Sequence, residues 1–241
     1  GYLAVLPSPG MKVETSTLVN ISQIDVGELP PELRTRQPAL GFRYIRPGYQ
    51  LALSVSEIQP EVEAEVRTVA RLDEHELNLE TNIHYSIRRA GVFQLQVQIP
   101  AELRRTNVEG EEIDDTSYDS TRGILTVNLR SKMTGSYVLS LSTEKTLEQA
   151  LSDGVSVPVI ETVGTRKERG FLAVITEASV RVKPAEDAVS GLDDVGVSDL
   201  PPEMLRRAGD VALAFKYFSQ PWSLSLAVDP IEPRVTAEVF N

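Results

Sequence analysis

The 241-residue sequence lacks cysteine, so it has no disulfide, no thiolate nucleophile and no cysteine-ligated zinc or iron–sulfur site. Basic residues are outnumbered, with 24 Lys and Arg against 35 Asp and Glu, and the formal net charge of −11 opposes binding to the phosphates of nucleic acid. No apolar run approaches the roughly 18 residues that a membrane-spanning helix needs. We therefore expect no nucleic acid partner and no membrane insertion by this chain.

Histidine is also scarce, and the two histidines do not form a metal-binding motif. His75 is followed by Glu76, but Leu79 stands where a zinc-protease motif on a helix needs its second histidine. His84 falls on the polar face of a predicted strand, and we expect both histidines to be ordinary surface residues. No nucleophile, base and orienting residue occur together in a recognisable spacing, so we expect no enzymatic activity in this chain.

An internal repeat is the strongest signal in the sequence. The segment GYLAVL at 1–6 recurs as GFLAVI at 170–175, and Leu-Pro-Pro-Glu at 29–32 recurs at 200–203. When 49–66 is aligned with 222–239, nine of the eighteen residues are identical, whereas composition alone would supply roughly one or two. The chain therefore contains two copies of one sequence module.

The repeat divides the sequence into three modules: module A (1–68), module B (69–169) and module A′ (170–241), with A and A′ as the two copies. The basic stretch at 166–169 is expected to be a solvated linker between B and A′. The chain begins without Met and ends within an alternating apolar pattern. We therefore expect it to be a fragment of a larger protein.

Apolar and polar residues alternate with period two in many segments, which is typical of half-buried strands. In module B the pattern predicts a hairpin of 77–87 and 93–99 around a turn at 89–91, followed by strands at 124–129, 137–142 and 155–160. In module A it predicts strands at 3–6, 11–14, 40–45, 51–56 and 62–66.

Helix signals are few in comparison. A helix is predicted at 202–209, where Pro202 stands near the start and Gly209 just past the end, and a short helical turn at 146–151. We expect an all-β fold of antiparallel β-sandwich modules, immunoglobulin-like or related, with an internal duplication and very little helix.

Aromatic side chains near the end of the chain suggest a ligand-binding platform. Tyr217, Phe218 and Trp222 lie close together in the sequence, and aromatic rings of this kind bind sugars. The first copy has Tyr44, Ile45 and Tyr49 at the matching positions, which also allows a role in the core of each module. Both interpretations stay open on sequence grounds.

Acidic side chains gather in one segment of module B, and oxygen ligands on a loop suit calcium. The spacing is not that of an EF-hand loop, so calcium is only an alternative to a solvated loop and no other cofactor is expected. The same acids are the candidates for a carboxylate-based hydrolase, for instance Glu111 with Asp115 or Asp119. The candidate ligands are Glu111, Asp114, Asp115 and Asp119.

The chain combines three sequence features: a repeated Gly-aromatic-Leu-Ala-Val strand, a Leu-Pro-Pro-Glu turn and the segment 94–100 (QLQVQIP). In this combination the sequence resembles the β-rich repeat regions of very large exported or envelope-associated bacterial proteins of unknown function. The resemblance implies an exported setting, periplasmic or at the cell surface, and a noncatalytic role.

The sequence thus favours a noncatalytic structural or binding segment of a larger exported protein. Its expected partners are another protein or neighbouring modules of the same parent chain. The first alternative is a carbohydrate-binding accessory module of a larger enzyme, and the second is the carboxylate-based hydrolase.

Overall fold

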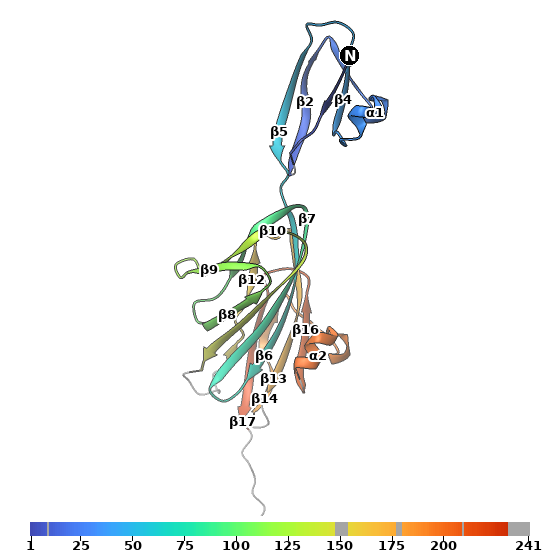
Figure 1. The fold of residues 1–241 in the computed structure, drawn as a ribbon. Helices are drawn as coiled ribbons and strands as arrows, with labels where there is room; N and C mark the ends of the chain where they lie inside the picture. Colours follow the sequence, from blue (N-terminus) through green and yellow to red (C-terminus); the bar gives the residue numbers. More distant parts are fainter. Residues whose placement is uncertain (9, 148–153, 177–179, 209, 231–241) are drawn as a thin grey trace, which may run out of the picture. The chain divides into compact units, whose positions relative to one another are not determined.

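The computed structural model describes residues 1–8, 10–147, 154–176, 180–208 and 210–230. These residues form strands in several antiparallel sheets with only short helices, so the predicted all-β fold is confirmed. The chain separates into two compact units, unit 1 (1–60) and unit 2 (from residue 61 onwards) (Figure 1). No helix of the described residues is both long and apolar enough to cross a membrane.

Unit 1 consists of two small sheets and two short helices. The first sheet has the order β1 (Tyr2–Val5), β4 (Leu40–Tyr44), β3 (Ile21–Ile24), and the second pairs β2 (Met11–Val19) with β5 (Gln50–Glu57). Between β3 and β4 lie the 3-10 helix η1 (Val26–Glu28) and the helix α1 (Pro31–Arg34). Few apolar side chains are buried in this unit: Ile21, Leu29 and Phe42.

Unit 2 is built on a nine-stranded sheet. Its main order is β15 (Asp193–Asp194), β16 (Val211–Tyr217), β13 (Lys167–Thr176), β6 (Glu61–Leu72), β7 (Glu76–Gln98), β10 (Ile124–Thr146), β8 (Arg104–Gly110). Two strands pair off this path: β12 (Glu161–Val163) with β7, and β9 (Ile113–Asp119) with β10. β6 and β13 pair in parallel, whereas the other neighbouring strands of this sheet pair antiparallel.

A second sheet and two helical segments complete unit 2 (Figure 1). The sheet has the order β11 (Val155–Ser156), β17 (Ser223–Pro230), β14 (Val180–Ser190). The 3-10 helix η3 (Val197–Asp199) precedes α2 (Pro202–Ala208), which matches the helix predicted from the sequence. The helical turn predicted at 146–151 falls mostly outside the described residues.

The hairpin predicted within 77–99 is wrong, because β7 continues through the expected turn as one strand. Arg89 has a φ of +67°, and the pairing with β10 shifts on both sides of Met133. These irregularities are β-bulges, which bend a strand without reversing it. The strands predicted at 124–129 and 137–142 are likewise two halves of β10, so β7 and β10 pair along most of their length.

Strand alternation separates the core of unit 2 from its outer surface. Leu77, Leu79, Thr81 and Ile83 of β7 are buried, while the alternate residues Asn78, Glu80 and Asn82 are only partly covered. The same hydrophobic cluster includes Leu139 of β10 and Leu226 of β17. Residues on both sides of position 169 therefore share one core.

The strands of the sequence repeat pair in the same registers in the two units. Leu3 lies opposite Phe42 in unit 1, and the aligned Leu172 lies opposite Phe215 in unit 2. In the second sheets, Val13 lies opposite Val55, and Val182 lies opposite Val228. The aligned residues thus occupy equivalent places in two copies of one strand arrangement.

The basic stretch at 166–169 is not a solvated linker, because β13 begins at Lys167 and Glu168 is buried with 8% of its surface exposed. The Glu168 carboxylate accepts hydrogen bonds from the Thr162 backbone N–H and hydroxyl, both at 2.6 Å. It also accepts from the Tyr217 hydroxyl at 3.1 Å and the Gln220 side-chain amide at 2.7 Å. Four donors therefore hold one buried carboxylate between β12, β13 and the end of β16.

Replacing this carboxylate tests its contribution to stability. Glu168→Ala leaves the four donors without their acceptor, and we expect the unfolding free energy of unit 2 to fall by about 3 kcal/mol. Denaturant unfolding followed by the fluorescence of Trp222, the single tryptophan, measures this change. The matched control is Lys167→Ala at an exposed neighbouring position, and an equal loss in both variants would contradict the interpretation.

Candidate functional site

Polar side chains from four adjacent strands line the face of the large sheet that points away from the core of unit 2. At directly paired positions lie Arg169 of β13, Glu65 of β6 and His84 of β7. Side chains on one face recur every second residue along a strand, so the flanking positions extend this surface in both directions. The flanking polar residues are Lys167, Glu63, Ser86 and Ser136 on one side and Arg67, Asn82 and Ser140 on the other.

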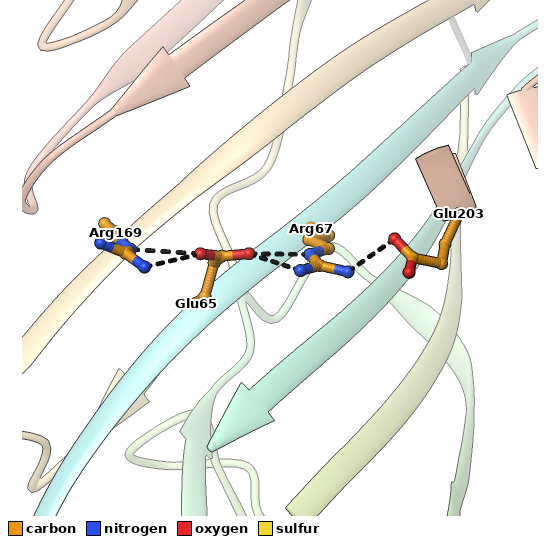
Figure 2. Close-up of polar contacts among 4 residues, drawn as sticks. All are labelled: Glu65, Arg67, Arg169 and Glu203. Atoms are coloured by element: carbon orange, nitrogen blue, oxygen red, sulfur yellow. Dashed lines mark hydrogen bonds and ion pairs between the residues drawn. The ribbon is translucent and has the colours of Figure 1, made fainter. Parts of the chain in front are cut away.

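A chain of ion pairs crosses this face (Figure 2). Arg169 donates to the Glu65 carboxylate from Nε at 3.1 Å and pairs through Nη2 at 3.0 Å. Arg67 donates to Oε1 of Glu65 from Nε at 2.9 Å and from Nη2 at 2.7 Å. The remaining Arg67 nitrogen, Nη1, donates to Glu203 at 3.0 Å. Two carboxylates and two guanidinium groups therefore alternate from β13 across β6 to α2.

Helix α2 brings Glu203 to this face by packing on one end of it. Leu200 and Met204 are buried against Val69, Ala173 and Ala214, in a small apolar cluster separate from the main core. The helix begins at Pro202, which favours the first turn of a helix because its fixed φ suits that position. The position of Glu203 is thus set by apolar packing rather than by its ion pair.

Two adjoining pockets of about 280 and 170 Å³ lie on the same face and share Arg67, His84 and Val138. We refer to them together as the polar groove. Its charged residues are three cations, Lys167, Arg67 and Arg169, and three anions, Glu63, Glu65 and Glu203. The charges balance, so the groove has no net charge in a chain that is strongly acidic overall.

The two arginines keep Glu65 ionised. Burial raises the pKa of Glu65, but the hydrogen bonds and charges of Arg67 and Arg169 outweigh this and leave the pKa below its usual value. The pKa of Glu203 is also lowered, by a backbone hydrogen bond and by the charge of Arg67. Carboxylates with lowered pKa values are poor proton donors at neutral pH.

His84 is neutral at neutral pH. Burial lowers its pKa from the ordinary value of 6.5, and the charge of Arg67 lowers it further, against smaller opposing effects of Glu65 and Glu203. Within the described residues, the nearby Ser140 hydroxyl donates to Asn82 rather than to His84. The described groove is thus a polar surface whose charged side chains are held by one another.

The structure separates the three aromatic residues that the sequence placed together. Trp222 and Tyr217 are 6% and 3% exposed, and their rings pack with centroids 5.7 Å apart at the edge of the core. Phe218 is 61% exposed and lies beneath the ammonium group of Lys216. A sugar-stacking platform needs exposed ring faces, and of the three only Phe218 has one.

The candidate acidic residues of module B lie in the connection between β8 and β9 and along β9, which pairs with β10, and they are exposed to solvent. Asp115 accepts a hydrogen bond from Asn128, and Asp119 accepts from the backbone N–H groups of Thr121 and Arg122. Within the described part of the chain, no three His, Asp or Glu side chains are placed to hold a metal ion. Neighbouring strand residues such as Asp114 and Asp115 point to opposite faces, which explains why these acids do not converge.

His84 lies on a polar strand face, as predicted, whereas the grouping of Glu65, Arg67, Arg169 and Glu203 was not predicted. Arg67 lies two residues from Glu65 on the same strand, which is a signal readable from sequence. The contacts with Arg169 and Glu203 join residues 104 and 136 positions apart. They depend on the parallel pairing of β6 with β13, which strand periodicity does not reveal.

The ion-pair chain is expected to stabilise unit 2. Arg67→Met removes the guanidinium group but keeps most of the side-chain stem, and it leaves Glu65 with Arg169 alone. Since the Glu65 and Arg67 side chains are only 20% and 17% exposed, we expect a loss of about 1–2 kcal/mol in denaturant unfolding. The control is Arg122→Met, whose side chain is 76% exposed and should change stability little. Equal effects of the two substitutions would argue against the network.

The lowered pKa of His84 predicts a pH dependence. The folded state binds the His84 proton less readily than the unfolded state, so this contribution to stability is present above about pH 6.5 and is lost as pH falls through the folded pKa. Between about pH 7.5 and 5 we expect a smaller drop in unfolding free energy for His84→Gln than for the unchanged chain. His75→Gln should retain the full drop, and a full drop in His84→Gln would refute the assignment.

No protein family matches the sequence, and no curated protein matches it either. Among solved structures, an M1 zinc metallopeptidase mutant from Deinococcus radiodurans, bound to Tyr-Ser-Ala, aligns with a TM-score of 0.40 and 9% identity over 69% of this chain and 42% of that chain. A two-domain M1 zinc metallopeptidase mutant bound to L-tryptophan aligns with a TM-score of 0.41 and 10% identity over 70% and 43%. This chain thus spans less than half of the proteins it is similar to, and likeness at this level carries no argument about function.

Proposed function

We propose that this chain is a noncatalytic structural and binding segment of a larger exported or envelope-associated protein, and that it contacts a protein partner through the polar groove. The observation that carries the proposal is the mutual neutralisation of the groove's charges, with Glu65 between two arginines and Arg67 between two carboxylates. Because the ion pairs already hold these side chains in one conformation, binding of a partner costs little additional side-chain entropy.

The composition of the groove supports a polar protein partner. Beside the ion pairs lie neutral hydrogen-bonding groups: His84, Asn82 and Ser140, the last two joined by a hydrogen bond of 2.7 Å. Protein interfaces of the non-obligate kind contain many direct and water-mediated hydrogen bonds of this type. The proposed setting outside the cytoplasm follows the resemblance to β-rich repeat regions of exported proteins.

The observed geometry gives less support to the two alternatives. The carbohydrate-binding interpretation relied on Trp222, which is buried against Tyr217. The hydrolase interpretation needs two carboxylates facing each other across a cleft, roughly 5 to 9.5 Å apart. Its candidates instead lie exposed on β9 and the connection before it, where Asp115 and Asp119 have hydrogen-bonding partners of their own.

Selection of peptides from a random display library on the immobilised chain tests the binding role. We expect the selected peptides to converge on the groove, so Ser140→Arg should weaken their binding about tenfold or more by filling the pocket. Ser22→Arg, at an exposed position in unit 1, is the matched control. Peptides whose binding is indifferent to Ser140→Arg would contradict the groove as the contact surface.

The noncatalytic role has its own test. The chain is incubated with chromogenic ester, glycoside and aminoacyl substrates, with and without Zn²⁺ or Ca²⁺. We expect no turnover above that of buffer. Turnover that disappears in Glu65→Gln, or in the pair Glu111→Gln and Asp115→Asn, would overturn the proposal and identify the carboxylates responsible.

A further inference from the structure

Unit 1 has the strand arrangement of module A′ but lacks the strands on which module A′ packs. In unit 2, β13 lies between β16 and β6, and β17 lies between β14 and β11. In unit 1, β1 is the counterpart of β13 and pairs only with β4, while β5 is the counterpart of β17 and pairs only with β2. Two strand edges that are occupied in unit 2 are therefore free in unit 1, as far as the described residues show.

The strands that occupy these edges in unit 2 belong to residues 61–163, which we call the receiving segment. β6 pairs with β13 over ten residue pairs, from Glu63 with Lys167 to Leu72 with Thr176. β11 pairs with β17 through Val155 and Ser156, and the Val157 N–H donates to the Leu224 carbonyl at 2.9 Å. The receiving segment thus holds module A′ by both of its sheets.

The apolar inner face of unit 1 is open where that of module A′ is covered. Val55 is 60% exposed, whereas its counterpart Val228 is 5% exposed. Six other residues of unit 1 are partly exposed while their counterparts in unit 2 are at most 6% exposed: Leu3 (Leu172), Val5 (Val174), Tyr44 (Tyr217), Tyr49 (Trp222), Leu51 (Leu224) and Leu53 (Leu226). In unit 2 these counterparts belong to the same core as the apolar residues of β6, β7 and β10.

The contrast is absent where each copy packs on its own strands: Phe42 and Leu29 are buried in unit 1 just as Phe215 and Leu200 are buried in unit 2, at 0%, 2%, 3% and 3% exposure. It recurs on the face that bears the helix, where Leu6 is 47% exposed and its counterpart Ile175, at 4%, lies in the cluster that includes Val69 of β6. Unit 1 is therefore open at positions where unit 2 has contacts from the receiving segment. Sets of exposed apolar side chains next to unpaired strand edges are the usual signature of an interaction surface.

We propose that unit 1 is the docking surface for a further β-segment of the same kind as the receiving segment. One strand of this partner adds in parallel to β1 as β6 adds to β13, a second pairs with β5 as β11 pairs with β17, and its apolar side covers Leu3, Leu53 and Val55. This inference goes beyond the proposed function, because unit 1 is a second binding surface in addition to the polar groove. The receiving segment of a second copy is already occupied by its own module A′, so a further segment is required.

The residues of β6 indicate which side chains the strand that pairs with β1 needs. Val62, Ala64 and Val66 point into the core of unit 2, and Val66 lies opposite Gly170. A Cβ at Gly170 would collide with the Val66 carbonyl and the Tyr217 ring, so only glycine allows this close approach. Gly1 occupies the matching position in unit 1. We therefore expect the added strand to carry small or β-branched apolar residues at alternate positions. These residues lie on the face of the sheet that packs into the shared core, as Val62, Ala64 and Val66 of β6 do in unit 2.

A chain extended at its N-terminus tests the proposal. A second copy of residues 61–169 is placed before Gly1, so that Arg169 of the added copy precedes Gly1 as it naturally precedes Gly170. Because the sequence has no cysteine, a single introduced thiol reports on its own surroundings. We expect Val55→Cys to react readily with a maleimide in the 241-residue chain and about tenfold more slowly or less in the extended chain, because a covered thiol reacts only after local opening.

Two matched thiols control for this labelling. Val228→Cys, the buried counterpart, should react slowly in both chains, and Glu14→Cys, at a side chain 62% exposed, should react quickly in both. A further thiol at the added copy of Leu139, which is fully buried in unit 2, reports whether the added segment folds. Docking requires that this thiol be protected together with Val55→Cys.

Equal reactivity of Val55→Cys in the two chains overturns the proposal, whether the added segment is folded apart from unit 1 or remains unfolded. Protection that depends on protein concentration in the unextended chain also overturns it, because unit 1 would then associate with a second copy. Neither result bears on substrate turnover or on peptide binding to the polar groove. Failure of the docking inference is thus distinguishable from failure of the proposed function.

Discussion

The parallel pairing of β6 with β13 is the interaction on which the rest of unit 2 depends. It joins residues 61–72 to residues 167–176, about a hundred positions along the chain, and so combines a strand from the end of module A with the first strand of module A′ in one sheet. On one face of this pair, Val66 and Leu172 enter the common core. On the other face, Glu65 meets Arg169, and the charged part of the polar groove begins there.

Both faces of this sheet are used, but for different purposes. The inner face is covered by the second sheet and contributes the large apolar core. Among the described residues, helix α2 covers one end of the outer face, where it packs on Val69 and Ala173 and brings Glu203 to Arg67. The polar residues beyond the helix are partly exposed and linked to one another. The proposed contact with a protein partner uses this part of the face, because charges arranged in fixed positions favour a partner with the complementary pattern.

Much of the fold was predictable because alternation is a local property. Strands β1, β2, β4 and β5 of unit 1, helix α2 and the inward face of β7 follow from residue spacing, since each side chain's face is set by its position along its own strand, whereas the short strand β3 was not predicted. The hairpin at 89–91 could not be excluded in this way. The glycine after Arg89 and Ala90 signals either a turn or a bulge, and only the partner strand β10, which pairs with both halves of β7, distinguishes the two.

The sequence by itself determined the all-β class and the repeat, because both are carried by the periodicity and identity of residues along the chain. The tertiary structure decided what the repeat means physically. Leu53 and Leu226 are the same residue in aligned strands, yet one is partly exposed and the other fully buried. Burial depends on which strands lie across from a residue, and these are brought together by long-range pairing rather than by any neighbour in the sequence.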